Sequence, residues 1–578
     1  MLRIETGLIL VAILIACIRP TLWQECFGWA EGRFSQFSRN RVAAVVAIGG
    51  LALVTRAALL PITQVPEPVV HDEFGYLLAA DTFVHGRLTN PTHPMWVHFE
   101  SFNILQKPSY QCITPPVQGL ILAFGRIVFG HPFWGVWVIA GLMCAAITWM
   151  LQGWLPPEWA LLGGILAILR YGVWTYWADS YWGGAAGAIG GALVLGALPR
   201  IKREALTRNT LIMSLGLAIL ANNRPYDGFI FSLPIVLALV AWIVSKESPP
   251  LRVSLRRVVL PITVVLAITA VGTGYYFWRV TGSPFRMPYA VEREQYGVAP
   301  YLLWQHLRPE PAYNHVVLRK MYVDAELVSY RTFRTPPGVA LKAYIAWMFY
   351  LGPLLTVPFL ALIFVLPYGF SWKQISRRTV FLLVVLGCVI AGCLSESFYV
   401  GAHYSSPVTG LVLALVVIAL SVIRRSGPRG VFLTRAFTVS AVLVFGLRTL
   451  AAPLHIPLGK SITTGLYERR ATGFGRPQIE QQLENIPAKH LVIVHYGPDH
   501  EPFNEWVYND ADIDRAKIVW AREMDPAENQ RLLRYFKDRQ AWLLDADALP
   551  LHLEPFPQPQ NEVRMSRSAD DGSVTGGN

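Results

Sequence analysis

The sequence predicts an all-α polytopic membrane protein of about twelve transmembrane helices, followed by a small α/β domain outside the membrane. The chain of 578 residues is 53% hydrophobic and only 15% charged, which is too apolar for an ordinary soluble protein. Apolar runs recur along residues 1–454, and from about residue 485 they give way to short β-branched runs joined by polar connections. Most of the chain is therefore expected in lipid.

Each candidate span is an apolar run close to the length that crosses a bilayer, which is roughly 20 residues. The first run is interpreted as an uncleaved span, because Arg19-Pro20 follows it and no small-residue cleavage site does. The candidate spans are 6–23, 42–62, 132–151, 157–176, 183–199, 209–223, 227–245, 258–279, 341–367, 379–395, 405–423 and 435–453.

Basic residues gather in short loops between these runs, at 31–41, 200–208, 246–257, 371–378 and 424–435. Lys and Arg next to a span are held on the cytoplasmic side of the membrane. We therefore assign the net charge of +12 to membrane topology and not to a nucleic-acid partner. The loops 63–131 and 280–340 and everything after about residue 454 are then expected outside the cytoplasmic membrane.

The stretch 115–130 decides this topology. A span there would place every later basic cluster outside, against the positive-inside rule. The stretch is short, opens with Pro115-Pro116 and contains Gln118 and Arg126, so we predict an interfacial or half-inserted helix. Only Cys112 of the six cysteines then lies in an external loop, and no disulfide is expected.

The region 485–555 is predicted to form the small extracytoplasmic α/β domain. Residues 490–496, 517–521 and 541–545 have the β-branched and aromatic composition of strands. A helix is expected after Asp525-Pro526, which is a helix start signal. The polar, Pro-containing tail 556–578 is expected to be disordered.

The adjacent carboxylates Asp72 and Glu73 follow the predicted span 42–62 by about ten residues. Helical spacing continues through Tyr76, Ala80 and Phe83, so the two acids are expected to begin a helix on the membrane surface. The plain alternative is an acidic helix start that the helix dipole stabilises.

Asp72-Glu73-x-x-Tyr76, followed by Ala80 and Gly86-Arg87, resembles the first external loop of the membrane glycosyltransferases of the GT-C superfamily, which include the protein O-mannosyltransferase and aminoarabinose transferase group. The resemblance implies a sugar donor carried on a polyprenyl phosphate and transfer with inversion to an extracytoplasmic lipid, glycan or protein. It implies Asp72 as the general base, with Glu73 assisting; the residues alone do not decide between the two.

Further residues resemble elements of the same superfamily or could face a donor phosphate. Lys107-Pro108 resembles a Lys-Pro-Pro element, although Ser109 departs from it, and a snorkelling lysine is the alternative. A local ion pair is the alternative for Arg224 and Asp227, and an interfacial polar position for His403. The predicted substrate-binding residues are Lys107, Arg224, His403, Tyr404, Tyr76 and Asp227.

Other functions are weighed against this one. A lipid or sugar transporter would carry acids inside its spans, which are nearly free of them here. A non-catalytic membrane scaffold would use only the terminal domain. No residues with metal-ligand spacing and no certain cofactor are predicted, although the resemblance leaves a divalent metal possible. Asp179 lies among aromatic residues that usually form an interfacial belt but could also contact a sugar.

Overall fold

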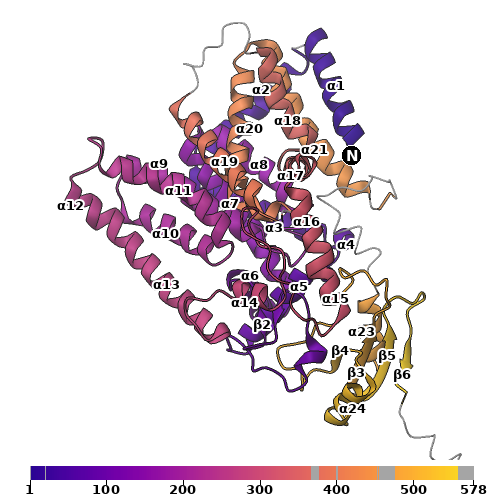
Figure 1. Cartoon of the computed structure of the whole chain (residues 1–578). Coiled ribbons are helices and arrows are strands. Elements are labelled where there is room, and N and C mark those ends of the chain that lie inside the picture. Colours follow the sequence, from indigo (N-terminus) through magenta and orange to yellow (C-terminus); the bar gives the residue numbers. More distant parts are fainter. Residues whose placement is uncertain are drawn as a thin grey trace, which may run out of the picture. The chain divides into compact units, whose positions relative to one another are not determined.

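The computed structural model describes residues 2–19, 21–365, 376–398, 401–451, 453–454 and 475–557. The chain divides into two units. Unit 1 comprises Met1–Thr92 and Phe102–Gly473, and unit 2 comprises His93–Ser101 and Phe474–Asn578 (Figure 1). Most of the predicted tail, residues 558–578, lies outside the described residues, as do most of the basic cluster 371–378 and residues 455–474.

Within the described residues of unit 1, eight helical segments are long and apolar enough to cross a membrane. They are α3 (Arg41–Ala58), α7 (Phe133–Trp154), α9 (Ala185–Arg203), α11 (Pro225–Ile243), α12 to α13 (Leu251–Thr281), α19 (Arg377–Ser395), η7 with α20 (Ala402–Arg424) and α21 (Pro428–Ala451). The chain is mostly helical and multi-pass, as predicted, but the count of about twelve spans is not confirmed.

Three predicted spans form shorter helices: α1 (Leu2–Ile18), α8 (Pro157–Ala167) and α10 (Thr207–Ala221). A π-helical turn, Ile168–Gly172, follows α8. Where one span over 341–367 was predicted, α17 (Pro336–Tyr350) and α18 (Gly352–Val365) meet at a bend of 97°. Gly352 adopts φ +57 and Pro353 lacks the amide hydrogen that would continue the helix, which explains the break.

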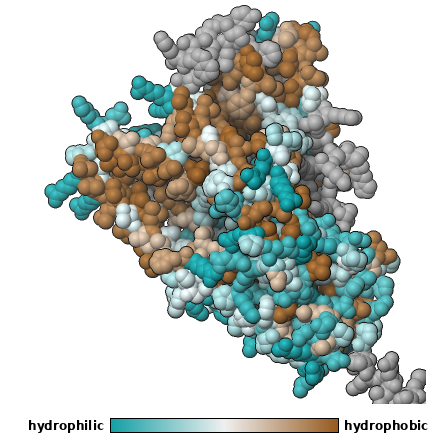
Figure 2. All heavy atoms as spheres, viewed as in Figure 1, coloured by the Kyte–Doolittle hydropathy of each residue, from teal (hydrophilic) through white to brown (hydrophobic). Residues whose placement is uncertain are grey.

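The spans differ in how much of each is covered by protein. In the most apolar window of the span that contains α20, 83% of the residues are buried, against 6% in the window of the span that contains α13. The large side chains exposed on α13 include Leu260, Val264, Ile268 and Val271, and Figure 2 shows hydrophobic side chains gathered over this part of the unit. A helix that is apolar and uncovered is suited to contact lipid.

Shorter elements of unit 1 join these spans. They are α2 (Gln24–Ser38), α4 (Leu60–Thr63), α5 (His71–Val84), β1 (Ile104–Leu105), β2 (Gln111–Cys112), α6 (Val117–Phe129), α14 (Pro288–Gln295), α15 (Val316–Arg319) and α16 (Glu326–Phe333). Helix α6 occupies the stretch 115–130; its 13 residues are too few for a span.

Ion pairs in unit 1 join segments that the predicted topology places on the same side. Glu31 contacts Arg424 at 3.0 Å and Arg435 at 2.8 Å, and all three were expected on the cytoplasmic side. Arg56, inside the predicted span 42–62, contacts Asp179, which was expected at the outer side, at 2.8 Å. The sidedness of the spans stays a prediction.

Unit 2 contains a four-stranded sheet in the order β4-β3-β5-β6 (Figure 1). The central strand β3 (His490–His495) pairs in parallel with β4 (Ile518–Arg522) and β5 (Gln540–Asp545), and β6 (Leu553–Pro555) is antiparallel to β5. The three predicted strands and the predicted helix, α24 (Pro526–Tyr535), are confirmed. Helix α23 (Arg476–Glu484) packs Leu483 in one cluster with Val492 and Val494 of β3.

A segment of the first loop, His93–Ser101, is part of unit 2. The His93 ring stacks on Phe536 at 5.8 Å, and His98 Nδ1 lies 3.0 Å from the Arg522 carbonyl oxygen. The Arg522 Nε donates to the Glu100 carbonyl oxygen at 2.7 Å. This segment and α23 lie outside the range 485–555 that the sequence predicts for the domain.

Candidate functional site

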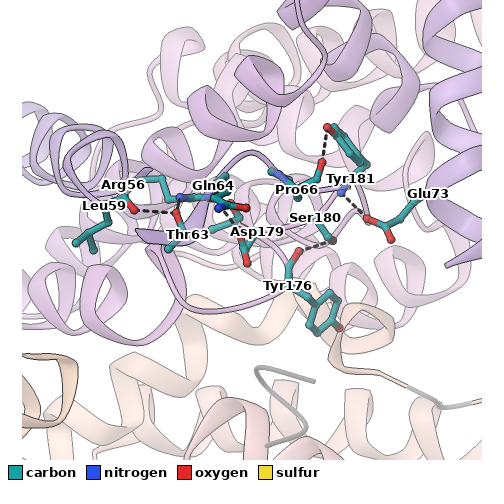
Figure 3. A network of polar contacts seen from close by, with 11 residues as sticks. Arg56, Leu59, Thr63, Gln64, Pro66, Glu73, Tyr176, Asp179, Ser180 and Tyr181 are labelled. Atoms are coloured by element: carbon teal, nitrogen blue, oxygen red, sulfur yellow. Dashed lines mark hydrogen bonds and ion pairs between the residues drawn. The ribbon is translucent and has the colours of Figure 1, made fainter. Parts of the chain in front are cut away.

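Helix α5 begins with the two predicted acids, and the structure gives them different surroundings. Glu73 is fully buried. Its Oε2 accepts from the backbone N–H groups of Val69 at 2.9 Å and Val70 at 3.0 Å. Its Oε1 accepts from the backbone N–H of Tyr181 at 2.9 Å, a bond that Figure 3 shows. The first two bonds satisfy donors that precede the helix, and the third joins it to a later segment. Glu73 therefore fixes the start of α5.

Asp72 keeps a partly exposed carboxylate. Its side chain is 19% exposed, its Oδ1 accepts from Asn103 Nδ2 at 3.1 Å, and its Oδ2 lies 3.5 Å from His71 Nε2. A general base needs a carboxylate oxygen that a substrate proton can reach. Of the two adjacent acids, Asp72 meets that requirement and Glu73 does not.

The Asp72 carboxylate acts on the pKa values of side chains from separate elements. Burial raises the pKa of Tyr76 on α5, and so does the nearby Asp72 carboxylate, whereas the Arg224 guanidinium lowers it. The same two charges act in the same directions on the pKa of Tyr289, on α14. Burial also raises the pKa of Cys112 on β2 to about 11, with a smaller contribution from Asp72. Asp72 and Arg224 thus act on one shared group of side chains.

Arg224 lies at the start of α11, and its guanidinium carbon is 4.4 Å from the centre of the Tyr404 ring. The side chain is partly buried. Among the described residues, none accepts a hydrogen bond from the guanidinium and none pairs with it within 4.0 Å. The alternative of a local ion pair with Asp227 is therefore not observed. An arginine with open donors beside an aromatic ring is suited to bind an anion.

Asp227 turns toward Glu396, and the two buried carboxyl groups share a hydrogen bond. Burial, together with the charge of Asp227, raises the pKa of Glu396 well above its ordinary range. Lys342 Nζ donates to the carbonyl oxygens of Glu396 and Cys393, the latter at 3.1 Å. This carboxyl pair lies next to Arg224, whose positive charge lowers the pKa of Glu396.

His403 lies in η7 (Ala402–Val408) and is almost fully buried. Its Nδ1 is 3.0 Å from the Tyr176 hydroxyl, and its ring centre lies 4.4 Å from that of Trp182 and 4.5 Å from that of Tyr404. It is therefore a packed interior residue beside Tyr404 and not an interfacial one. A Cβ added at Gly191 of α9 would overlap the Pro407 backbone, so this glycine allows the close approach of η7.

Lys107 is exposed, and its carbonyl oxygen accepts from Gln295 Nε2 at 3.0 Å. Asp179 forms the ion pair with Arg56 that Figure 3 shows. Because that pair occupies the Asp179 carboxylate, the alternative of a sugar contact loses support. The site therefore joins Asp72, Tyr76, Arg224 and Tyr404, with His403 and the Asp227–Glu396 pair next to them.

Two parts of the site were not predicted from the sequence. Asn103 holds Asp72, and its backbone φ of +58 cannot be read from one residue type. Tyr289 comes from the loop 280–340, where Arg293 forms a buried clamp with Glu292 at 2.9 Å and Glu326 at 2.6 Å. Within the described residues no cluster of three or more His, Cys, Asp or Glu side chains could hold a metal ion.

No protein-family model matches the chain, and a search of the curated proteins finds no matching sequence. Solved structures similar to it include ArnT from Cupriavidus metallidurans bound to undecaprenyl phosphate, at 13% identity, a TM-score of 0.45 and coverage of 87% of this chain and 92% of ArnT. The archaeal oligosaccharyltransferase AglB from Archaeoglobus fulgidus, in complex with an inhibitory peptide and a dolichol-phosphate, matches at 11% identity, a TM-score of 0.44 and coverage of 87% and 69%. At these values neither likeness assigns an activity to this chain.

Proposed function

We propose that the chain is an integral membrane glycosyltransferase that moves a sugar from a polyprenyl-phosphate-linked donor to an acceptor outside the cytoplasmic membrane. The observation that carries the proposal is the pairing of an accessible carboxylate with an open cation in one aromatic site. Asp72 supplies the carboxylate, and Arg224 supplies guanidinium donors that no described residue uses. The resemblance of the Asp72 motif to the GT-C superfamily supports the same function.

The reaction follows from these two groups. The acceptor hydroxyl or amine gives its proton to Asp72 while its oxygen or nitrogen forms a bond to the anomeric carbon. The bond between that carbon and the phosphate oxygen breaks, and its electron pair leaves with the polyprenyl phosphate. Arg224 stabilises the negative charge that develops on the phosphate. Attack opposite the leaving group inverts the anomeric centre.

Aromatic walls suit the sugar. Tyr76, Tyr289 and Tyr404 are buried or half-buried around the two charges, and sugar rings stack on aromatic faces. Glu73 holds the start of α5, and the Arg56–Asp179 pair holds the neighbouring loop. Lys107, which is exposed, is proposed as a contact to the lipid phosphate or headgroup region and not to the anomeric centre.

The test is transfer of label from polyprenyl-phosphate-linked pentoses and hexoses into cell-envelope acceptors by the purified chain in lipid nanodiscs. We expect Asp72→Asn to lose at least about a hundredfold of the transfer rate, with an unchanged thermal unfolding midpoint. Asp81→Asn is the matched control, because Asp81 lies on the same helix but pairs with Arg126 at 2.6 Å.

Transfer by Asp72→Asn at the wild-type rate would overturn the role of Asp72 as the base. Movement of labelled lipid or sugar across vesicles by the wild type, without any covalent transfer, would overturn the enzyme in favour of a transporter. If removing the C-terminal part of unit 2 abolished activity while Asp72→Asn had no effect, the scaffold alternative would replace the proposal.

A further inference from the structure

Asn103 stands at an unusual backbone position next to Asp72. It has φ +58, in the left-handed region that residues other than Gly, Asn and Asp seldom adopt. Its carbonyl oxygen accepts from the Ile113 backbone N–H at 3.1 Å, and β1 begins at the next residue. The turn is therefore anchored on both sides, and the side chain leaves it in a fixed direction.

The Asn103 side chain points to Asp72, the candidate base. Asn103 Nδ2 donates to Asp72 Oδ1 at 3.1 Å. The other oxygen, Oδ2, lies 3.5 Å from His71 Nε2. Phe102, which precedes Asn103, packs its ring against those of His71 and Tyr322 at 6.1 and 6.2 Å. The turn thus holds both Asn103 and the residue next to Asp72.

We propose that Asn103 is the positioning residue of Asp72, an inference that rests on the proposed function. Its amide N–H orients the carboxylate so that the second oxygen faces the acceptor. The other groups that face Asp72 are His71 and Tyr76 on α5, Cys112 on β2, Tyr289 on α14, Tyr404 in η7 and the Arg224 cation nearby.

Asn103→Gly separates positioning from folding, because glycine accepts a positive φ without strain. We expect its kcat to fall about ten- to a hundredfold, the range for losing a hydrogen bond to a charged group, with the donor KM within about threefold of wild type. A fall in kcat without a matching rise in the donor KM indicates a misplaced catalytic group and not weaker donor binding.

Asn103→Asp is the second variant. Aspartate tolerates the same backbone conformation but removes the N–H donor to Asp72, so its kcat should fall at least as far as that of Asn103→Gly. Gln64→Gly is the matched control. Gln64 is an exposed non-glycine residue with φ +57, and its substitution should leave kcat and KM unchanged.

The failures are distinguishable. If Asp72→Asn keeps wild-type transfer, the proposed function loses its base. If Asp72→Asn is inactive but both Asn103 variants keep the wild-type kcat, the positioning role alone is overturned. A loss of activity that accompanies a lower thermal unfolding midpoint would show that Asn103 only supports folding and would likewise overturn it.

Discussion

Arg293 and Arg224 are two arginines of unit 1 with opposite surroundings. Arg293 donates to both oxygens of Glu326, to Glu292 and to the Ala299 carbonyl oxygen, at 2.6 to 3.2 Å. The Arg224 guanidinium lies over the Tyr404 ring, and no described residue accepts its hydrogen bonds. A buried cation with every donor engaged stabilises the fold, whereas one with open donors can bind a ligand. Glu73 and Asp72 show the same contrast between two acids.

The largest expected effect is the loss of stability when Arg293, the fully hydrogen-bonded arginine, is replaced. Arg293→Met removes the cation and leaves Glu292 and Glu326, with side chains 1% and 13% exposed, without their charge partner. Breaking such a buried pair costs about 3–5 kcal/mol. We expect a marked drop in the thermal unfolding midpoint in detergent, measured by tryptophan fluorescence. An unchanged midpoint would mean that the clamp does not hold the loop 280–340.

Replacing Arg224, whose hydrogen-bond donors are open, should lower activity and leave stability unchanged. Arg224→Gln should lower kcat about a hundred- to a thousandfold, the range for losing one charge-stabilising group. Its unfolding midpoint should stay near wild type, since no described residue is left without a hydrogen-bond partner. Arg224→Lys, which keeps the charge and loses the planar fork, is the control and should recover part of the rate. A variant that unfolds early would place Arg224 with Arg293 as a structural residue.

A smaller effect tests the two acids. Glu73→Gln should destabilise the protein by about 1–3 kcal/mol, because one oxygen that accepts from backbone amides becomes an amide group. The transfer rate of the folded fraction should change little. The comparison is with Asp72→Asn, for which the rate falls and the midpoint stays. If Glu73→Gln instead lost transfer at full stability, the roles of the two acids would be reversed.

The sequence predicted those parts of the site that lie on regular elements. Asp72, Glu73 and Tyr76 share the helical spacing of α5, and the three strands of unit 2 follow from β-branched runs. Arg224 was predicted, but its open donors were not, because the partners of a side chain depend on the folded chain. The bend at Gly352-Pro353 follows from the backbone chemistry of these two residues. It was not predicted, because the apolar run 341–367 continues through it.

The contacts between distant segments could not be predicted. His93 lies 421 residues before Asp514, and their 3.2 Å contact within unit 2 cannot be predicted from the periodicity of the sequence. Asn103 is likewise defined by a backbone conformation and by a partner 31 residues earlier. Hydrophobic periodicity reports which face of an element is covered, but it does not report what covers it.

The smallest expected effect concerns His98, an engaged side chain of unit 2. Burial lowers the pKa of His98, and its Nδ1 lies 3.0 Å from the Arg522 carbonyl oxygen. The unfolded chain, whose histidine pKa is near 6.5, therefore binds more protons than the folded one, so stability rises with pH. This contribution is present above about pH 6.5 and is lost as the pH falls below it.

The His98→Asn variant tests this dependence, because asparagine can still donate to the carbonyl oxygen but does not titrate in this range. We expect its unfolding midpoint to fall less than that of wild type between pH 7.5 and 5.5, by a difference of a few degrees at most. His552→Asn is the control, since His552 is exposed and should leave the wild-type slope unchanged. Equal slopes for His98→Asn and wild type would show that His98 takes up its proton in the folded state as readily as in the unfolded one. His98 would then resemble the open side chains Arg224 and Asp72 and not the fully hydrogen-bonded Arg293.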